Sequence, residues 1–139
     1  MSPETAELVK RSWSAILPRR KEVCGTFYRR LFEVYPEVQP LFKGDMARQT
    51  NLFVTMINTV ISALDNPRPV RPLLQTLGAR HADYGVSAED YQKFEAVLLD
   101  TLEQALGDEF TADTRTAWRS VYEKLAGTMR AGAESVRAG

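Results

Sequence analysis

One ten-residue segment organises the interpretation of this chain: Leu77-Gly78-Ala79-Arg80-His81-Ala82-Asp83-Tyr84-Gly85-Val86. It contains His81, the only histidine of the 139 residues. Leu74, Leu77, His81 and Tyr84 recur at helical spacing, so they share one stripe of a helix that the sequence predicts over about residues 70–83. An imidazole in an apolar stripe needs a partner, because burying a polar group without one costs about 1–3 kcal/mol. A haem iron is one such partner, and a backbone carbonyl in an ordinary helical core is the other.

The composition predicts one soluble globular domain over residues 1–139. Hydrophobic residues are 44% and charged residues 26% of the chain, which are ordinary values. The 18 basic residues balance the 18 acidic ones, so no net charge favours nucleic acid or an anionic membrane. The single cysteine, Cys24, cannot form an internal disulfide. We expect Cys24 to be a small buried hydrophobic residue. The lack of a disulfide also fits a reducing compartment, so we expect a cytoplasmic protein.

Several classes of protein are excluded by missing patterns. The N-terminus carries Glu4, Glu7 and Lys10 and no long apolar run, unlike a signal peptide, and no stretch of about 18 apolar residues could span a membrane. One histidine and one cysteine cannot make a zinc site of the Cys/His type. The phosphate-binding glycine loop and the Gly-x-Ser-x-Gly elbow are also missing.

The whole chain is predicted to be helical. Ser2, Ser87 and Thr111 are suited to cap the starts of helices, and Gly85 is suited to the left-handed conformation that closes one. No segment shows the sustained alternation of a strand. The predicted helices cover about residues 2–17, 20–35, 46–64, 70–83, 87–107 and 111–132, and the chain is expected to fray after about residue 132.

Four motifs, in this order and spacing, make the chain resemble a globin. They are Phe27-Tyr28-Arg29-Arg30-Leu31-Phe32, Pro36-Glu37-Val38-Gln39-Pro40-Leu41-Phe42, Leu77-Gly78-x-x-His81-x-x-x-Gly85-Val86 and Ala117-Trp118-x-x-x-Tyr122. The sequence is most similar to bacterial single-domain haemoglobins and to the globin part of flavohaemoglobins, and the run from 77 to 122 also resembles neuroglobin. The resemblance implies an all-α globin fold, a three-over-three helical sandwich around haem. The truncated two-over-two globins are a poorer match, because the first helix is full length.

The resemblance also implies haem b, with His81 as the proximal iron ligand. Phe42 matches the phenylalanine that packs on the haem face, and its alternative role as a core aromatic is compatible with this because haem is part of the core. Val86 matches an apolar residue against the proximal face. Arg80 is expected either to pair with a haem propionate or to be an ordinary solvated arginine.

On the distal side, Tyr28 matches the tyrosine of bacterial haemoglobins. Gln49 falls at the position often occupied by histidine, and Phe53 lies one turn later over the ligand. A register slip of one residue would replace Gln49 by Arg48 or Thr50. A phenol and an amide can both donate hydrogen bonds to bound dioxygen, which carries partial negative charge.

Three features depart from the related families. Without a second histidine, coordination of the iron by two histidines is impossible. Flavohaemoglobins join the proximal histidine to a tyrosine–glutamate pair; Tyr91 matches that tyrosine, but the glutamate position falls at Ala133, with Glu134 beside it. The chain also shows no flavin or nicotinamide motif of a reductase.

These features predict a haem protein that reversibly binds dioxygen, and also carbon monoxide and nitric oxide, for oxygen carriage or storage. The first alternative is a nitric oxide dioxygenase that works with a separate reductase. The second is a gas or redox sensor, and a haem-free helical bundle is the remaining possibility.

Overall fold

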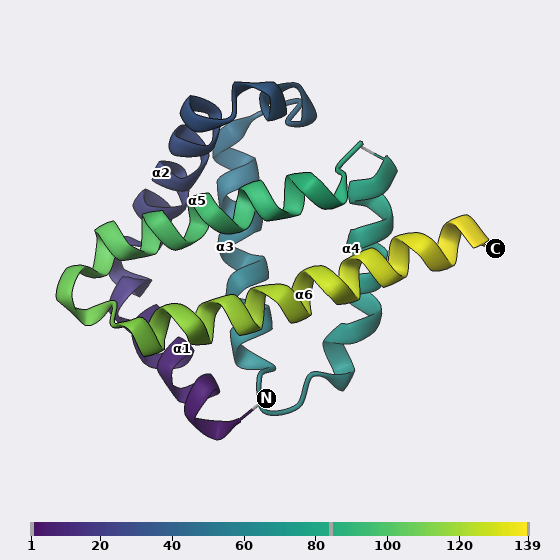
Figure 1. Cartoon of the computed structure of the whole chain (residues 1–139). Coiled ribbons are helices and arrows are strands. Elements are labelled where there is room, and N and C mark those ends of the chain that lie inside the picture. The colour runs from purple at the N-terminus through teal and green to yellow at the C-terminus, as the bar shows by residue number, and fades with distance from the viewer. Residues whose placement is uncertain (1, 84, 139) are drawn as a thin grey trace.

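The chain folds into two layers of three α-helices (Figure 1). The computed structural model describes residues 2–83 and 85–138, without the side chains of 83 and 135–138. Every regular element in these ranges is helical, which confirms the predicted all-α fold. The helices are α1 (Pro3–Ile16), α2 (Arg20–Val34), α3 (Met46–Ser62), α4 (Arg71–Asp83), α5 (Ala88–Leu106) and α6 (Ala112–Ala138). Short 3-10 turns connect them: η1 (Leu17–Arg19), η2 (Pro36–Leu41), η3 (Arg68–Val70) and η4 (Gly107–Glu109).

The helices α5 and α6 lie side by side in the front layer, and α1 crosses behind α6 (Figure 1). The helix α2 packs on both α3 and α5, and α4 packs on α6, while α3 and α4 make few backbone contacts with one another. In Figure 1, α5 and α6 pass in front of α3 and α4. Among the described residues, no helix is long and apolar enough to cross a membrane.

The helix ends lie where local sequence signals predict them. The Ser2 hydroxyl accepts the Thr5 amide at 3.2 Å, and the Thr111 hydroxyl accepts the Thr114 amide at 3.1 Å. Ser87 and Asp90 form a reciprocal capping box at the start of α5. Gly85 has φ +93°, the conformation expected of a glycine that ends the helix carrying His81.

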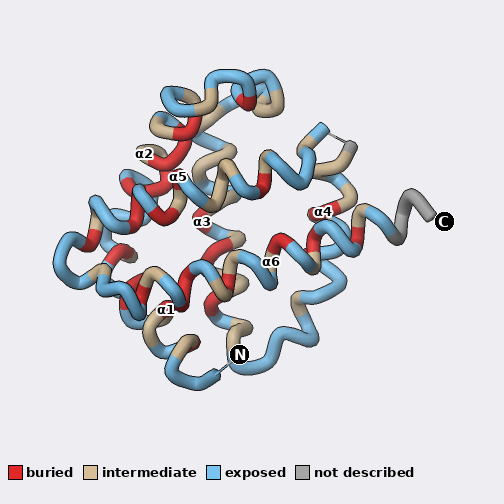
Figure 2. The backbone as a smooth tube through the Cα atoms, in the orientation of Figure 1, coloured by how far each residue is buried: buried red, intermediate tan, exposed pale blue. Residues whose placement is uncertain are grey.

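A buried core joins α1, α3, α5 and α6 around two tryptophans. Trp13 and Trp118 meet edge to face with ring centroids 6.3 Å apart. Their indole N–H groups are both satisfied, by Asn58 Oδ1 at 2.6 Å and by Ser12 Oγ at 2.8 Å. Figure 2 shows the buried residues on the sides of the helices that face their neighbours. Val54, Ile57 and Ile61 are the α3 members of this core.

The helices α4 and α6 approach each other through two glycines. A Cβ atom on Gly78 would collide with the backbone of Met129, and one on Gly132 would collide with the backbone of Gln75. The helix α6 continues to Ala138, beyond the end predicted near residue 132, and the fraying of this segment stays a prediction. Gly132 marks a close helix contact rather than a helix end.

Replacing Gly78 by alanine should destabilise the protein by about 1–3 kcal/mol, the usual cost of overpacking, because backbone atoms of Met129 cannot move aside as a side chain can. Gly127→Ala, on α6 with no atom within 4 Å of the added Cβ, is the matched control. It should be neutral or stabilising by up to about 1 kcal/mol. Urea unfolding of both variants measures the difference, and equal midpoints would contradict the close contact.

Candidate functional site

Tyr28 on α2 and Gln49 on α3 meet across the gap between their helices. The Gln49 Nε2 atom donates a hydrogen bond to the Tyr28 hydroxyl oxygen at 3.1 Å. Of the neighbouring positions, Arg48 is exposed and the Thr50 hydroxyl donates back to the Met46 carbonyl at 2.8 Å. The arrangement therefore brings the side chain of Gln49, among the three register alternatives, to Tyr28.

Phenylalanines surround this polar pair, and we call Phe27, Phe32, Phe42, Phe53 and Phe94 the aromatic shell. The Tyr28 ring centroid lies 5.0 Å from Phe27, 5.4 Å from Phe42, 5.6 Å from Phe53 and 6.3 Å from Phe32. Phe94 completes the shell from α5, 6.1 Å from Phe42. The helical periodicity places Phe94 on the inner face of α5, but no sequence signal indicates its contact with Phe42.

Burial in this shell raises the pKa of Tyr28 to about 12, although the hydrogen bond from Gln49 acts in the opposite direction. Tyr28 is therefore a neutral phenol that keeps its proton at ordinary pH. Since Gln49 donates to the phenol oxygen, the Tyr28 O–H remains available to donate to a third group.

Cys24 lies one turn before Tyr28 on α2 and is buried. Burial raises the pKa of its thiol to about 12. The thiol is therefore a small apolar part of the core, which agrees with one of the two expectations from the sequence.

His81 lies in the last turn of α4, half-buried. Its Nδ1 atom is 2.8 Å from the Leu77 carbonyl oxygen one turn earlier. Because a carbonyl can only accept, Nδ1 carries the proton, and Nε2 of the neutral ring keeps a free lone pair. Burial also lowers the pKa of His81, which favours the neutral ring. A neutral imidazole whose other nitrogen is held by a carbonyl is the form that binds a metal.

Tyr91 on α5 stacks beside His81, with ring centroids 6.5 Å apart and an interplanar angle of 26°. The Tyr122 hydroxyl donates to the Tyr91 carbonyl at 2.6 Å, which joins α6 to α5 next to the histidine. Val86 packs in the same cluster, and Tyr84, a member of the predicted stripe, lies outside the described residues.

An open pocket of about 350 Å³ lies beside Tyr91, between α4, the start of α5 and α6, and Gly78, Ala82 and Val86 are among its lining residues. Ala133, Glu134 and Arg130 of α6 line it together with Tyr91. Burial raises the pKa of Tyr91, and the positive charge of Arg130 partly opposes this shift. Among the described residues, no hydrogen bond joins the Tyr91 hydroxyl to Glu134 or to His81. Glu134 thus shares a pocket with Tyr91 without bonding to its hydroxyl.

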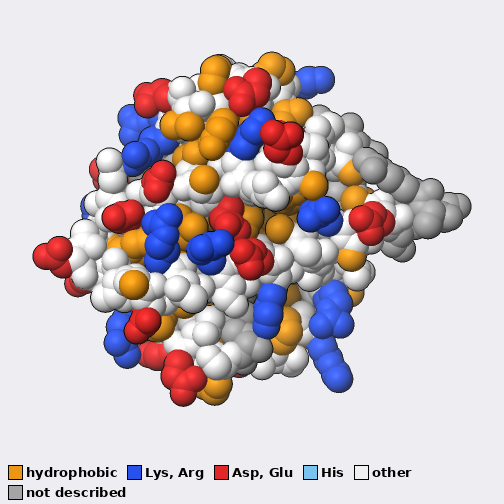
Figure 3. All heavy atoms as spheres, in the orientation of Figure 1, with side chains coloured by type: hydrophobic (Ala, Val, Ile, Leu, Met, Phe, Trp, Pro, Cys, Tyr) orange, Lys and Arg blue, Asp and Glu red, His pale blue; other side chains and the backbone are white. Residues whose placement is uncertain are grey.

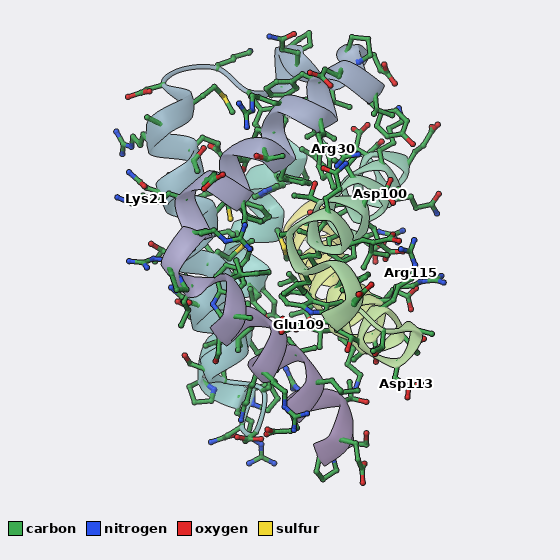
Figure 4. All side chains as sticks on the ribbon, turned by 90° about the vertical axis from the view of Figure 1, so that its left-hand side faces the viewer. Lys21, Arg30, Asp100, Glu109, Asp113 and Arg115 are labelled. Atoms are coloured by element: carbon green, nitrogen blue, oxygen red, sulfur yellow. The ribbon has the colours of Figure 1, made fainter. Side chains whose placement is uncertain are left out.

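A second open pocket, of about 570 Å³, lies between α2 and the end of α5. It is lined by polar side chains, among them Arg30 and Asp100, which Figure 4 shows on the side of the molecule away from α4. None of its lining residues belongs to the aromatic shell or to the surroundings of His81, so we do not assign it to the site.

Several apolar residues of α3, α4 and the adjoining segments are only partly buried, in contrast to the core around Trp13 and Trp118: Phe42, Phe53, Met56, Val60, Leu77 and Val86. Phe53, Met56 and Val60 share one stripe of α3 with Gln49, and Leu77 shares the stripe of His81. These residue types fit a flat apolar group such as haem, which would complete their burial and could bind to the neutral His81 ring. Arg80, at the end of α4, is exposed and stays a candidate for a propionate.

An all-helical fold with a half-buried neutral imidazole that keeps one ring nitrogen free is typical of helical haem proteins. Comparison with known sequences makes the class specific, because residues 25–129 match the family model "Globin". The chain belongs to the globin family. This membership supports haem-based gas binding.

Individual relatives are distant in sequence and close in fold. The chain is 26% identical over 126 residues to a flavohemoprotein of Bacillus subtilis, covering 88% of this chain and 32% of that protein. It is 25% identical to neuroglobin of Dissostichus mawsoni, covering 95% of this chain and 92% of that protein. Among solved structures, an engineered carbene transferase from Rhodothermus marinus, described as a candidate nitric oxide dioxygenase, matches with TM-score 0.90 and 28% identity. That match covers 99% of this chain and 96% of the other. The predicted resemblance to flavohaemoglobins and neuroglobin is confirmed.

Because the pKa of Tyr28 is about 12, we expect its phenol to stay protonated up to about pH 11. The tyrosinate absorbance that develops between about pH 8 and 11 should therefore be the same in the haem-free wild type and in Tyr28→Phe. Near-ultraviolet difference titration measures it. A rise smaller by about one tyrosine in the variant would show that Tyr28 is accessible to solvent.

Proposed function

We propose that this protein binds haem b through Nε2 of His81 and reversibly binds dioxygen on the opposite side of the haem, for oxygen carriage or storage. When bound, haem supplies the iron at which a diatomic gas is held. The observation that carries the proposal is the hydrogen bond from Gln49 to Tyr28, because it leaves the phenol proton for a ligand.

Each residue of the site has a defined part in this proposal. Tyr28 donates its proton to the ligand, and Gln49 orients the phenol. Phe42, Phe53 and Val86 contact the haem and exclude water from it, so the hydrogen bond from Tyr28 acts in surroundings of low polarity. Arg80 pairs with a propionate at the surface.

His81→Ala should abolish tight haem retention, because the chain contains no other histidine. Absorption spectra of the purified protein in its ferric and ferrous states, with dioxygen and with carbon monoxide, measure this directly. Gln49→Leu, which leaves His81 in place, is the control and should keep its haem. An unchanged ferrous spectrum and haem content in His81→Ala would overturn the assignment of the ligand.

Tyr28→Phe should release dioxygen faster, by about tenfold if the phenol contributes about 1.4 kcal/mol. The variant keeps the ring and therefore most of the packing of the aromatic shell. Gln49→Leu should also release dioxygen faster, with a smaller effect on carbon monoxide, which is less polar and gains less from a donor. Stopped-flow dissociation of both gases from the wild type, the two variants and the double variant separates the contributions.

Wild-type release of dioxygen in all three variants would exclude the polar distal pocket. Equal effects of Gln49→Leu on dioxygen and carbon monoxide would instead mean that Gln49 acts through packing.

The second candidate function is nitric oxide dioxygenation with a separate reductase. It is favoured by the flavohemoprotein relatives, of which this chain spans about a third, and by the Rhodothermus structure. Tyr28 and Gln49 would act in the same way, since both functions depend on holding dioxygen. Fast nitrate formation sustained by an added reductase favours the enzyme, whereas slow autoxidation without response to a reductase favours storage. A cytoplasmic location stays a prediction of the sequence.

A further inference from the structure

We propose that Lys93 is a positioning residue for the candidate haem pocket: it ties η2, which leads directly into Phe42, to α5, and so keeps Phe42 against Tyr28. This inference rests on the proposed function, because the pocket that Phe42 helps to form is the one assigned to haem.

Lys93 joins three groups at the start of α5. Its Nζ atom lies 3.3 Å from a carboxylate oxygen of Glu37 on η2 and 3.8 Å from Asp90 one turn earlier on α5. The same atom lies 5.6 Å from the centre of the Tyr35 ring, at the end of α2, in a cation–π arrangement. Lys93 thereby holds both Tyr35 and Glu37 of the segment between α2 and α3.

The Lys93 side chain is 19% exposed and that of Asp90 14%, while Glu37 is 54% exposed, so the contact differs from an ordinary surface ion pair on the α5 side and not at Glu37. Exposed pairs contribute little, because solvent screens them and two long side chains lose freedom. Here the aliphatic stem of the lysine is covered, and one ammonium group is shared by two carboxylates and an aromatic ring. We call these four residues, Tyr35, Glu37, Asp90 and Lys93, the η2 clip.

Two sets of contacts connect the η2 clip to Tyr28. Phe94 follows Lys93 in the chain, and its ring lies 6.1 Å from Phe42, which in turn lies 5.4 Å from Tyr28. Val38, inside η2 and 1% exposed, belongs to the same buried cluster as Tyr28. If η2 lost its contact with Lys93 at Glu37, both Val38 and Phe42 would therefore move away from Tyr28.

The decisive variant is Lys93→Met, which keeps an apolar stem of similar length and removes the charge. Amide hydrogen exchange of residues 35–42 should accelerate by roughly threefold to tenfold. This is the change in exchange rate that corresponds to the free energy of a partly buried ion pair and a cation–π contact. In the carbon monoxide complex, the C–O stretching band should broaden or split, since Phe42 and Tyr28 then sample more positions. Lys93→Arg should restore both properties, because guanidinium can make the same contacts.

Arg115→Met is the matched control. Arg115 pairs with Glu103 at 3.4 Å near the other end of α5, and Figure 4 shows it on the outside of the molecule. Its removal should leave the exchange of residues 35–42 and the C–O band unchanged. Glu37→Gln serves as a second test should Lys93→Met not fold, and it should reproduce the faster exchange.

Three outcomes overturn parts of this scheme and can be told apart. Unchanged exchange in Lys93→Met and Glu37→Gln overturns the η2 clip. Faster exchange with an unaltered C–O band shows a structural contact without influence on the pocket, and overturns the positioning role. A wild-type protein that binds no haem overturns the proposed function, and this is visible before any variant is made.

Discussion

The backbone contact between α4 and α6 is the constraint on which the rest of the site depends. Since α3 and α4 scarcely touch, α4 is held in place mainly from the α6 side, where Gly78 and Gly132 let the two helices approach closely. Gly78 lies three residues before His81, so the same contact fixes the height and rotation of the imidazole. The contact with α6 therefore determines where the last turn of α4, and with it His81, lies in the fold.

Around Tyr28 and Gln49, a polar pair lies inside the apolar aromatic shell. The shell and the polar pair influence each other. The aromatic shell keeps the Tyr28 phenol neutral, and the low polarity of the surroundings strengthens the hydrogen bond that the phenol makes. Gln49 satisfies the phenol oxygen, which would otherwise be a costly buried acceptor. Figure 3 shows a different arrangement on the outer face, where basic and acidic side chains are mixed, in keeping with the zero net charge.

Local sequence signals predict most of the fold, because a helix cap or an apolar stripe depends only on residues that are close together in the sequence. Ser2, Ser87 and Gly85 mark ends that the structure confirms. Gly132 misleads because a glycine that ends a helix and a glycine that admits a neighbouring helix look the same in one sequence. In the site, Gln49 lies beside Tyr28 as the resemblance implies, whereas the contacts of Lys93 with η2 join residues more than fifty positions apart and leave no local pattern.

The protonated thiol of Cys24 has a consequence for a protein proposed to handle nitric oxide and dioxygen. Thiolates, and not thiols, are the forms that nitrosating and oxidising species attack most readily. Burial raises the pKa of this thiol to about 12, so the single sulfhydryl group of the chain stays protonated and unreactive, one helical turn before the Tyr28 phenol. Reactive by-products formed next to Tyr28 would thus diffuse away from the protein before they found a nucleophilic sulfur.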